Sequence, residues 1–301
     1  MGDRPVCVVI LSCKSSGSSV LQNLLCKYAG AKHVMHTRHA QHETLYWTKA
    51  ASILGRVQCR IPGSEVPIPP RKALHETYNL LTANLPHFVP PADSRELIFE
   101  GWRRLCHHFG PIFVEKSPHH LHQWAALELL LEAVRLLPEV EFRFIGLARN
   151  PMDVLYSLWV RFRTDPVSFQ HHWQSAYENL LRLEQHVAGQ LLTLRYEQLA
   201  AHGDGARRVL EFLGQPPVPD AEQFVHGHSL QRWRKDPWFG FRLHPRIEQL
   251  AVSFGYGPDD LSNQSYPLWG LYRVGSQLDK CALSNRWHVL RRRLRNRQFA
   301  T

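Results

Sequence analysis

The opening segment of the chain places the strongest constraint on its fold. Residues Cys7–Leu11 form a continuous apolar run rich in Val and Ile, which is typical of a strand buried in a parallel sheet. A loop of small polar residues, Ser12–Ser19, follows, and apolar residues then recur at helical spacing from Val20 to Tyr28. The chain therefore begins with a buried strand, a short polar loop and a helix.

The same alternation continues along the chain. Further strands are predicted at Ile112–Glu115, Glu141–Ala148 and Leu191–Arg195. Helices are predicted over 43–54, 71–81, 93–109, 119–136, from Pro151 onward, and over 206–213, while 240–270 carries no clear pattern. Alternating strands and helices predict an α/β fold: a P-loop-like, three-layer arrangement with a central parallel sheet flanked by helices. One domain is expected over 1–270, with a helical and loop insert at about 43–110.

The loop after the first strand has the composition of a phosphate site. It contains Lys14, Ser15, Ser16, Gly17, Ser18 and Ser19. Backbone N–H groups at a helix N-terminus are unpaired, the helix dipole favours an anion, and Gly17 lets the backbone approach it closely. The pattern G-x-x-x-x-G-K-[ST] of nucleotide triphosphatases is not met, because no lysine follows the glycine. A serine-rich turn that only caps the helix is the alternative.

A second anion-binding arrangement is predicted at the end of the strand 141–148. Arg149 ends this strand, Pro151 opens the next helix, and Ser157 lies about two turns along it. Arg149 and Ser157 can converge on one phosphate, to which a guanidinium group donates two hydrogen bonds. A surface arginine paired with Asp153 is the alternative.

These two segments resemble the donor-binding motifs of sulfotransferases that use 3′-phosphoadenosine 5′-phosphosulfate (PAPS). In that family an Arg and a Ser eight residues later hold the 3′-phosphate, and Arg149 and Ser157 match within an R-N-P-x-D segment. Ser16–Ser19 match the S-G-T-[ST] loop, although the basic residue Lys14 stands one position earlier than usual. Three weaker matches are Glu115–Pro118 (E-K-[ST]-P), Leu194–Leu199 (R-Y-E-x-L, with Tyr196) and the basic segment Arg232–Arg234.

The resemblance implies an enzyme that moves a sulfuryl group from PAPS to an acceptor hydroxyl and releases 3′-phosphoadenosine 5′-phosphate (PAP), with no metal. It implies donor binding by the Lys14–Ser19 loop, Arg149, Ser157, Tyr196, Arg232 and Arg234. Lys14 would stabilise charge on the leaving group, and Glu43 is the first candidate for the general base. The rivals for this role are His36, His39, His42 and Glu115. A carboxylate that only complements the dipole at a helix start is the alternative for Glu43.

The formal charge of +10 predicts anionic partners. Two other classes of protein stay open: a P-loop nucleotide kinase, and a non-enzymatic module that binds polyanions. No nucleic acid partner is expected. Carbohydrates, other alcohols and phenols all stay open as acceptors.

The C-terminal residues 271–301 are predicted to form a basic amphipathic tail. Leu283, Trp287, Leu290 and Leu294 recur at helical spacing among arginines. Packing on the protein body or a dimer contact, a membrane surface, and capture of a polyanionic acceptor are its three candidate uses. The six cysteines form no C-x-x-C pair and no apolar run is long enough to span a membrane, so a cytoplasmic protein with reduced thiols is expected.

Overall fold

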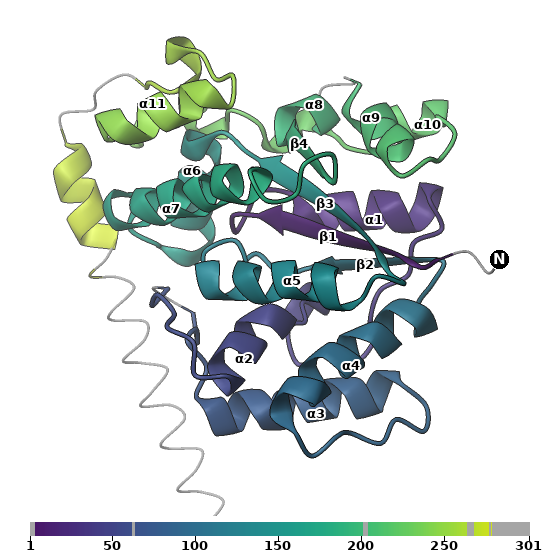
Figure 1. The fold of residues 1–301 in the computed structure, drawn as a ribbon. Coiled ribbons are helices and arrows are strands. Elements are labelled where there is room, and N and C mark those ends of the chain that lie inside the picture. The colour runs from purple at the N-terminus through teal and green to yellow at the C-terminus, as the bar shows by residue number, and fades with distance from the viewer. Residues whose placement is uncertain (1–3, 62–63, 201–203, 264–267, 277, 279–301) are drawn as a thin grey trace, which may run out of the picture.

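Four parallel strands form the central sheet of the computed structural model, which describes residues 4–61, 64–200, 204–263, 268–276 and 278 (Figure 1). The strands are β1 (Val6–Ser12), β2 (Ile112–Lys116), β3 (Glu141–Ala148) and β4 (Leu191–Arg195), in the order β2-β1-β3-β4. Each predicted strand is found, with bounds that differ by at most one residue. β1 lies between β2 and β3, so the segments that follow these three strands leave the sheet side by side.

Alternate residues of β1 supply two separate cores, one on each face of the sheet. Cys7, Val9 and Leu11 belong to the larger core, while Val8 and Ile10 belong to the smaller one on the opposite face. All five side chains are fully buried. Because β1 is buried on both faces, its sequence is a continuous apolar run and does not alternate between apolar and polar residues.

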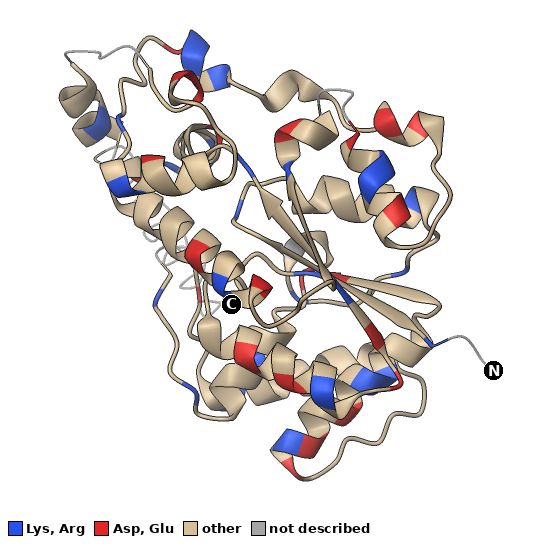
Figure 2. Cartoon of the chain, turned by 45° about the horizontal axis from the view of Figure 1, so that its top comes forward, with Lys and Arg blue, Asp and Glu red and all other residues tan. Residues whose placement is uncertain are grey.

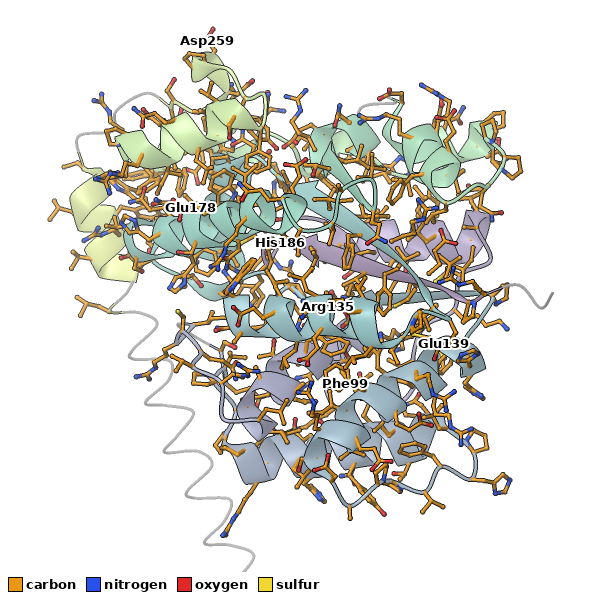
Figure 3. All side chains as sticks on the ribbon, viewed as in Figure 1. Phe99, Arg135, Glu139, Glu178, His186 and Asp259 are labelled. Atoms are coloured by element: carbon orange, nitrogen blue, oxygen red, sulfur yellow. The ribbon has the colours of Figure 1, made fainter. Side chains whose placement is uncertain are left out.

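Helices cover both faces of the sheet, which confirms the predicted α/β three-layer fold (Figure 1). The smaller core lies under α1 (Ser18–Tyr28), α8 (Tyr196–Ala200), α9 (Gly205–Phe212) and α10 (Pro219–Glu222). The larger core lies under α2 (Tyr46–Ile53), α4 (Ser94–His108), α5 (Trp124–Leu136), α6 (Pro151–Phe162), α7 (Pro166–Glu184) and α11 (Pro245–Ser253), with α3 (Pro70–Asn84) against α2. Side chains fill the space between these layers, and Phe99 of α4 is one of them (Figure 3).

Two helices begin later than predicted, because hydrogen bonds to distant segments hold the residues before them in turns and loops. The helix expected over 119–136 begins at Trp124. The preceding residue, Gln123, uses its side-chain amide to bond both backbone polar groups of Cys59, at 2.7 and 2.6 Å. Sequence patterning also missed α7 and α11. In α11, His244 caps the helix and Pro245 occupies its first turn.

Acidic and basic residues are interspersed along the outer helices (Figure 2). In the described part of the chain, no helix combines the length and apolar character needed to cross a bilayer. The predicted stripe of the tail, Leu283–Leu294, lies outside the described residues, and the use of this tail stays a prediction.

Candidate functional site

Every strand of the sheet delivers one element of the candidate site at its carboxyl end. β1 is followed by the loop 13–17, β2 ends with Lys116, β3 is followed by Arg149 and β4 by Tyr196. The carboxyl ends of parallel strands share one edge of a sheet, which is where open α/β sheets bind ligands. Residues far apart in sequence are therefore brought to one edge.

The loop between β1 and α1 has the backbone of an anion site. Ser15 and Gly17 adopt left-handed conformations, with φ of 65° and 93°. Helix α1 begins at Ser18, and no side chain caps its first turn, so its N–H groups are available to an anion. The hydroxyl of Ser16 is instead buried, 3.2 Å from that of Tyr177 on α7. Ser16 therefore anchors the loop, while the backbone and Ser19 remain at the site.

Arg149 joins the loop to two other segments of the site. It is only 6% exposed, so it is not the surface arginine of the alternative interpretation. One guanidinium nitrogen, Nη1, donates to the carbonyl oxygen of Ser15 (2.9 Å), and Nη2 donates to that of Ser229 (2.9 Å). The guanidinium group also lies over the ring of Tyr196, 4.7 Å from its centroid. Its Nε–H is buried without a hydrogen-bond partner among the described residues, so one donor is left for a ligand.

The segment that contains Arg232 and Arg234 is tied to the start of α6. Buried Asp153 accepts a hydrogen bond from the backbone N–H of Gln231 (2.8 Å). Burial raises the pKa of Asp153 to about 6, against the opposing effect of Arg149. Arg232 is exposed, whereas Arg234 bonds the carbonyl oxygen of Asp259 and lies 3.6 Å from a carboxylate oxygen of Asp260.

Ser157 lies half-buried on α6, two turns after the residue that caps this helix. That cap is Asn150, whose side-chain oxygen accepts from the N–H of Met152. The Asn-Pro pair therefore starts the helix immediately after Arg149, which fixes the helical face on which Ser157 stands relative to the arginine.

Lys116 and Glu43 form the second half of the site, opposite the hydroxyl of Ser19. Lys116 Nζ donates to Ser19 Oγ (2.9 Å) and lies 3.4 Å from a carboxylate oxygen of Glu43. Burial lowers the pKa of Lys116 and raises that of Glu43, while their mutual attraction opposes both shifts. Sequence reasoning did not select Lys116 as a site residue, although the E-K-S-P segment at a strand end was a signal for it.

Glu43 does not open a helix, contrary to the sequence prediction. The helix begins three residues later, at Tyr46, because Ser117 Oγ accepts the backbone N–H groups of Thr44 (3.2 Å) and Leu45 (2.9 Å). These bonds hold the chain in a loop beside the end of β2. The dipole explanation for Glu43 therefore does not apply, and its carboxylate faces Lys116 instead.

Glu115 is enclosed by partners. It accepts hydrogen bonds from Thr44 Oγ1 (2.7 Å) and Ser117 Oγ (2.5 Å), and its side chain is fully buried. Burial alone would raise the pKa of Glu115, but His120 and these hydroxyl donors lower it. Glu115 thus positions the Glu43 loop, and it has no access to an acceptor.

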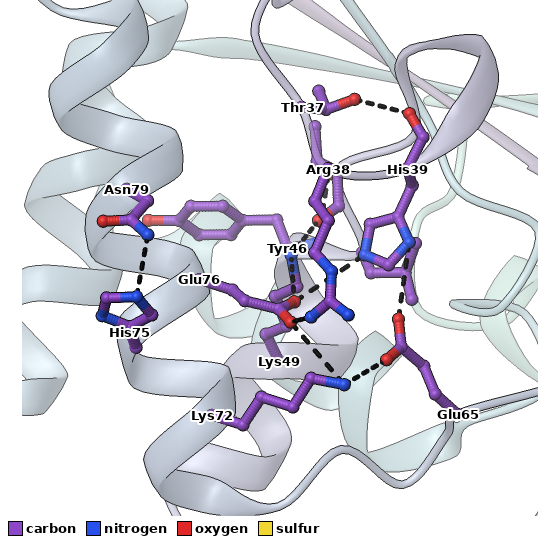
Figure 4. A network of polar contacts seen from close by, with 12 residues as sticks. Thr37, Arg38, His39, Tyr46, Lys49, Glu65, Lys72, His75, Glu76 and Asn79 are labelled. Carbon is purple, nitrogen blue, oxygen red and sulfur yellow. Dashed lines mark hydrogen bonds and ion pairs between the residues drawn. The ribbon is translucent and has the colours of Figure 1, made fainter. Parts of the chain in front are cut away.

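A network of ion pairs holds the loop that precedes Glu43 (Figure 4). Buried Glu76 on α3 pairs with Arg38 and with Lys49, whose Nζ lies 3.2 Å away. His39 lies between Glu76 (3.8 Å) and Glu65 (3.5 Å), and Lys72 contacts both carboxylates. His39, Glu65 and Glu76 are close enough to share a metal ion, but three cationic side chains already neutralise the two carboxylates. The other two rival candidates for the general base, His36 and His42, are both exposed.

Lys14 points into a cavity of about 260 Å³ beside the loop. Its ammonium group lies 4.4 Å from the centre of the Phe162 ring on α6. Burial lowers the pKa of Lys14, and the carboxylate of Glu43 opposes this shift. Lys14, Glu43 and Lys116 therefore surround one region at the edge of the sheet, with the cavity on the Lys14 side.

Comparison with known proteins identifies the family. Residues 5–220 match the family model described as the sulfotransferase family, which is most of the chain. The chain belongs to the sulfotransferase family. This sulfotransferase is therefore an enzyme that transfers a sulfuryl group, and nothing in the comparisons supports the kinase or polyanion-module alternatives. No match was found among curated protein sequences.

Two solved structures share the fold of this sulfotransferase. The sulfotransferase domain from the curacin biosynthetic pathway has a TM-score of 0.54 and 17% identity, with 84% of this chain and 98% of that chain covered. The sulfotransferase domain from the Synechococcus PCC 7002 olefin synthase has a TM-score of 0.50 and 18% identity, with 85% and 96% covered. At these identities the likeness concerns the fold alone.

Proposed function

We propose that this enzyme transfers the sulfuryl group of PAPS to an acceptor hydroxyl and releases PAP. The observation that carries the proposal is the position of Arg149, which is buried, bonded to the Ser15 carbonyl oxygen and stacked on Tyr196. An arginine with a free N–H donor beside a phosphate loop suits a nucleotide with phosphates at two positions. ATP, whose phosphates form one chain, does not require this second cation.

On the donor side, the 5′-phosphosulfate would lie on the Lys14–Ser19 loop and the N-terminus of α1. The 3′-phosphate would bind Arg149 and Ser157, with Tyr196 supporting the guanidinium group. Arg232, exposed on the segment that Ser229 joins to Arg149, would close over the nucleotide. Arg234 would act less directly, because Asp259 and Asp260 already engage it.

In the transfer step, the acceptor oxygen attacks sulfur and the bond from sulfur to the bridging oxygen breaks, so that PAP leaves with the electron pair. Lys14, Lys116 and the hydroxyl of Ser19 would stabilise the charge that grows on the leaving phosphate. Glu43 would take the proton of the acceptor hydroxyl. Burial raises the pKa of Glu43, which makes it a stronger base than an exposed carboxylate, while Lys116 at 3.4 Å keeps it ionised.

The cysteines support a cytoplasmic location as a further proposal. Five of them, Cys7, Cys13, Cys26, Cys59 and Cys106, are free thiols in the described part of the chain, and oxidising compartments favour disulfides.

Calorimetry with four ligands tests the proposed function: PAP, 5′-AMP, ATP with magnesium, and heparin. PAP is expected to bind much more tightly than 5′-AMP, because the 3′-phosphate adds a charge-assisted contact worth about 1.5–3 kcal/mol. Binding of ATP with magnesium in preference to PAP would favour a kinase. Binding of heparin alone, with steep salt dependence, would favour a polyanion-binding module.

A further inference from the structure

The cavity beside Lys14 is built from four segments that meet only in the folded chain. Lys14 comes from the phosphate loop, and Pro118, His119 and His122 come from the turn after β2. The other two segments are the loop before α3, with Ile61 and Ser64, and the α6–α7 region. The cavity therefore adjoins the proposed donor site through Lys14, the residue of the phosphate loop that lines it.

Its walls are largely apolar. Ile61, Pro118, Leu158, Phe162 and Phe169 supply aliphatic and aromatic surface from three of the four segments. Four of the five are buried, and Phe162 places its ring beside the Lys14 ammonium group. Such walls favour apolar groups and penalise a hydroxyl that finds no partner.

The polar groups of the cavity carry no negative charge. None of the described lining residues is Asp or Glu, and Lys14 is the one lysine or arginine among them. Burial lowers the pKa of His119 to about 4 and that of His122 to about 3, so both imidazoles are neutral near pH 7. The Nδ1 atoms of both rings are buried and have no hydrogen-bond partner among the described residues.

We infer that this cavity is the acceptor site and that the acceptor is a small, uncharged, mainly apolar alcohol or phenol, with its hydroxyl at the end formed by Lys14 and His119. The inference rests on the proposed function and narrows its acceptor class. A neutral imidazole with an unused ring nitrogen forms a hydrogen bond with a hydroxyl but offers no positive charge to pair with a sulfate or carboxylate. A polyhydroxylated or anionic glycan would leave its polar groups unpaired against the apolar walls.

The size of the cavity agrees with this class. Its volume of about 260 Å³ is slightly below the roughly 300–1,000 Å³ of pockets that enclose drug-sized ligands. A compact molecule, or a single apolar chain end, fits this space. An extended sugar chain needs a longer groove with polar walls.

A homologous series of acceptors tests the inference. The PAP-bound enzyme is titrated with 1-hexanol, 1-heptanol, 1-octanol and 2-naphthol, and with a desulfated heparin disaccharide for comparison. Affinity is expected to rise about fourfold for each added methylene, as burial of a CH₂ group predicts. The disaccharide should bind more weakly than any of the alcohols. Affinity that does not change with chain length, or tighter binding of the disaccharide, would overturn the inference.

Two substitutions locate the binding in this cavity. Thr164→Trp and Ser64→Trp each place a large ring into it from a different wall. Each should weaken 1-octanol and 2-naphthol binding by roughly tenfold or more, with PAP affinity unchanged. Ser253→Trp, at an exposed position on α11, is the matched control and should bind both as the wild type does. Normal alcohol binding in both cavity variants would refute the site.

The two proposals fail in different ways. If the enzyme does not bind PAP, the proposed function is wrong, while alcohol binding to the free protein and its loss in the Trp variants still test the cavity. If PAP binds and the alcohols do not, the proposed donor stands and the acceptor class inferred here is wrong.

Discussion

The ring of Tyr196 lies directly against Gly17, so closely that a Cβ atom at this glycine would stand 2.3 Å from the ring carbons Cδ2 and Cε2. The loop and the β4–α8 junction thus fit together only without a side chain at position 17. The same Tyr196 ring supports Arg149, and any displacement of the ring would therefore reach both proposed phosphate sites.

Gly17→Ala should therefore weaken PAP binding by at least about tenfold, because the added methyl group moves Tyr196 away from Arg149. Calorimetric titration measures this loss. Gly30→Ala is the matched control: Gly30 also has a positive φ, of 64°, but open space around it. It should cost about 1–2 kcal/mol in stability and leave PAP affinity unchanged. If the Gly17 variant binds PAP as tightly as the wild type does, the contact between Gly17 and Tyr196 does not have the proposed role.

Arg149→Ala should lower the affinity for PAP by roughly tenfold or more and leave the affinity for 5′-AMP nearly unchanged, because only PAP carries the 3′-phosphate. Both ligands are measured by calorimetry on the same preparation. Arg182→Ala removes another arginine stacked on an aromatic ring, that of Trp124, and serves as the control. The assignment fails if the Arg149 variant loses both ligands equally.

Glu43→Gln should retain PAP affinity and lower turnover by about 10²–10⁴-fold, since the amide cannot take the acceptor proton. Sulfuryl transfer to 2-naphthol, or to any acceptor that supports turnover, is the measurement. Glu184→Gln, at an exposed position on α7, should behave as the wild type. Normal turnover in the Glu43 variant would move the role of base to another group, and His119 in the cavity would be the next to test.

Lys14→Ala should lower turnover more than PAP affinity if Lys14 stabilises the leaving group. Lys116 lies closer to Ser19 and Glu43, so Lys116→Ala provides the comparison. A loss of affinity alone in the Lys14 variant would show that it only positions the donor, and a loss of turnover in the Lys116 variant would then assign the leaving-group role to Lys116.

Glu76→Ala should destabilise the protein by about 3–5 kcal/mol, because it leaves Lys49 buried without its carboxylate partner. The double variant K49M/E76M should recover most of this stability, since apolar side chains replace the buried pair. Urea denaturation measures both. If the single variant is as stable as the wild type, the network does not hold the Glu43 loop as described.

His119 and His122 should make the folded protein lose stability as the pH falls from about 6.5 toward 4, and Asp153, whose folded pKa of about 6 lies above its usual value, should offset part of this loss. His119 and His122 have pKa values near 4 and 3 when folded, against about 6.5 when unfolded, so the unfolded chain binds more protons in this range. Each imidazole contributes a slope of up to about 1.4 kcal/mol per pH unit. His122→Leu should remove one such contribution, measured as urea midpoints at several pH values. An unchanged slope in this variant would show that His122 is protonated in the folded state.

The sheet could be predicted from sequence because β1 and β3 are buried on both faces, and strands of this kind appear in the sequence as short, continuous apolar runs. The loop at Gly17 and the start of α6 at Pro151 could also be predicted, since local backbone chemistry determines them. The surroundings of Glu43 could not be predicted from the sequence. Tyr46 begins the helix only because Ser117, seventy-two residues after Leu45, accepts the backbone N–H groups before it.

The same limit applies to the acceptor side. His119 and His122 were two of nineteen histidines in the sequence, and no spacing set them apart. They become distinctive only when α6 and α7 close over the turn after β2, which places aromatic side chains around them. Contacts of this kind depend on how distant elements pack, and a sequence pattern carries no record of that packing.

Each of the four strands ends at one element of the candidate site. A bound donor would therefore contact all four strands of the sheet. A nucleotide held between the β1 loop, Lys116, Arg149 and Tyr196 would link β1, β2, β3 and β4, which include both edge strands of the sheet. Opening either edge of the sheet would then require release of the nucleotide. Nucleotide binding would accordingly slow backbone amide hydrogen exchange in the edge strands β2 and β4, although both are far from Gly17 in the sequence.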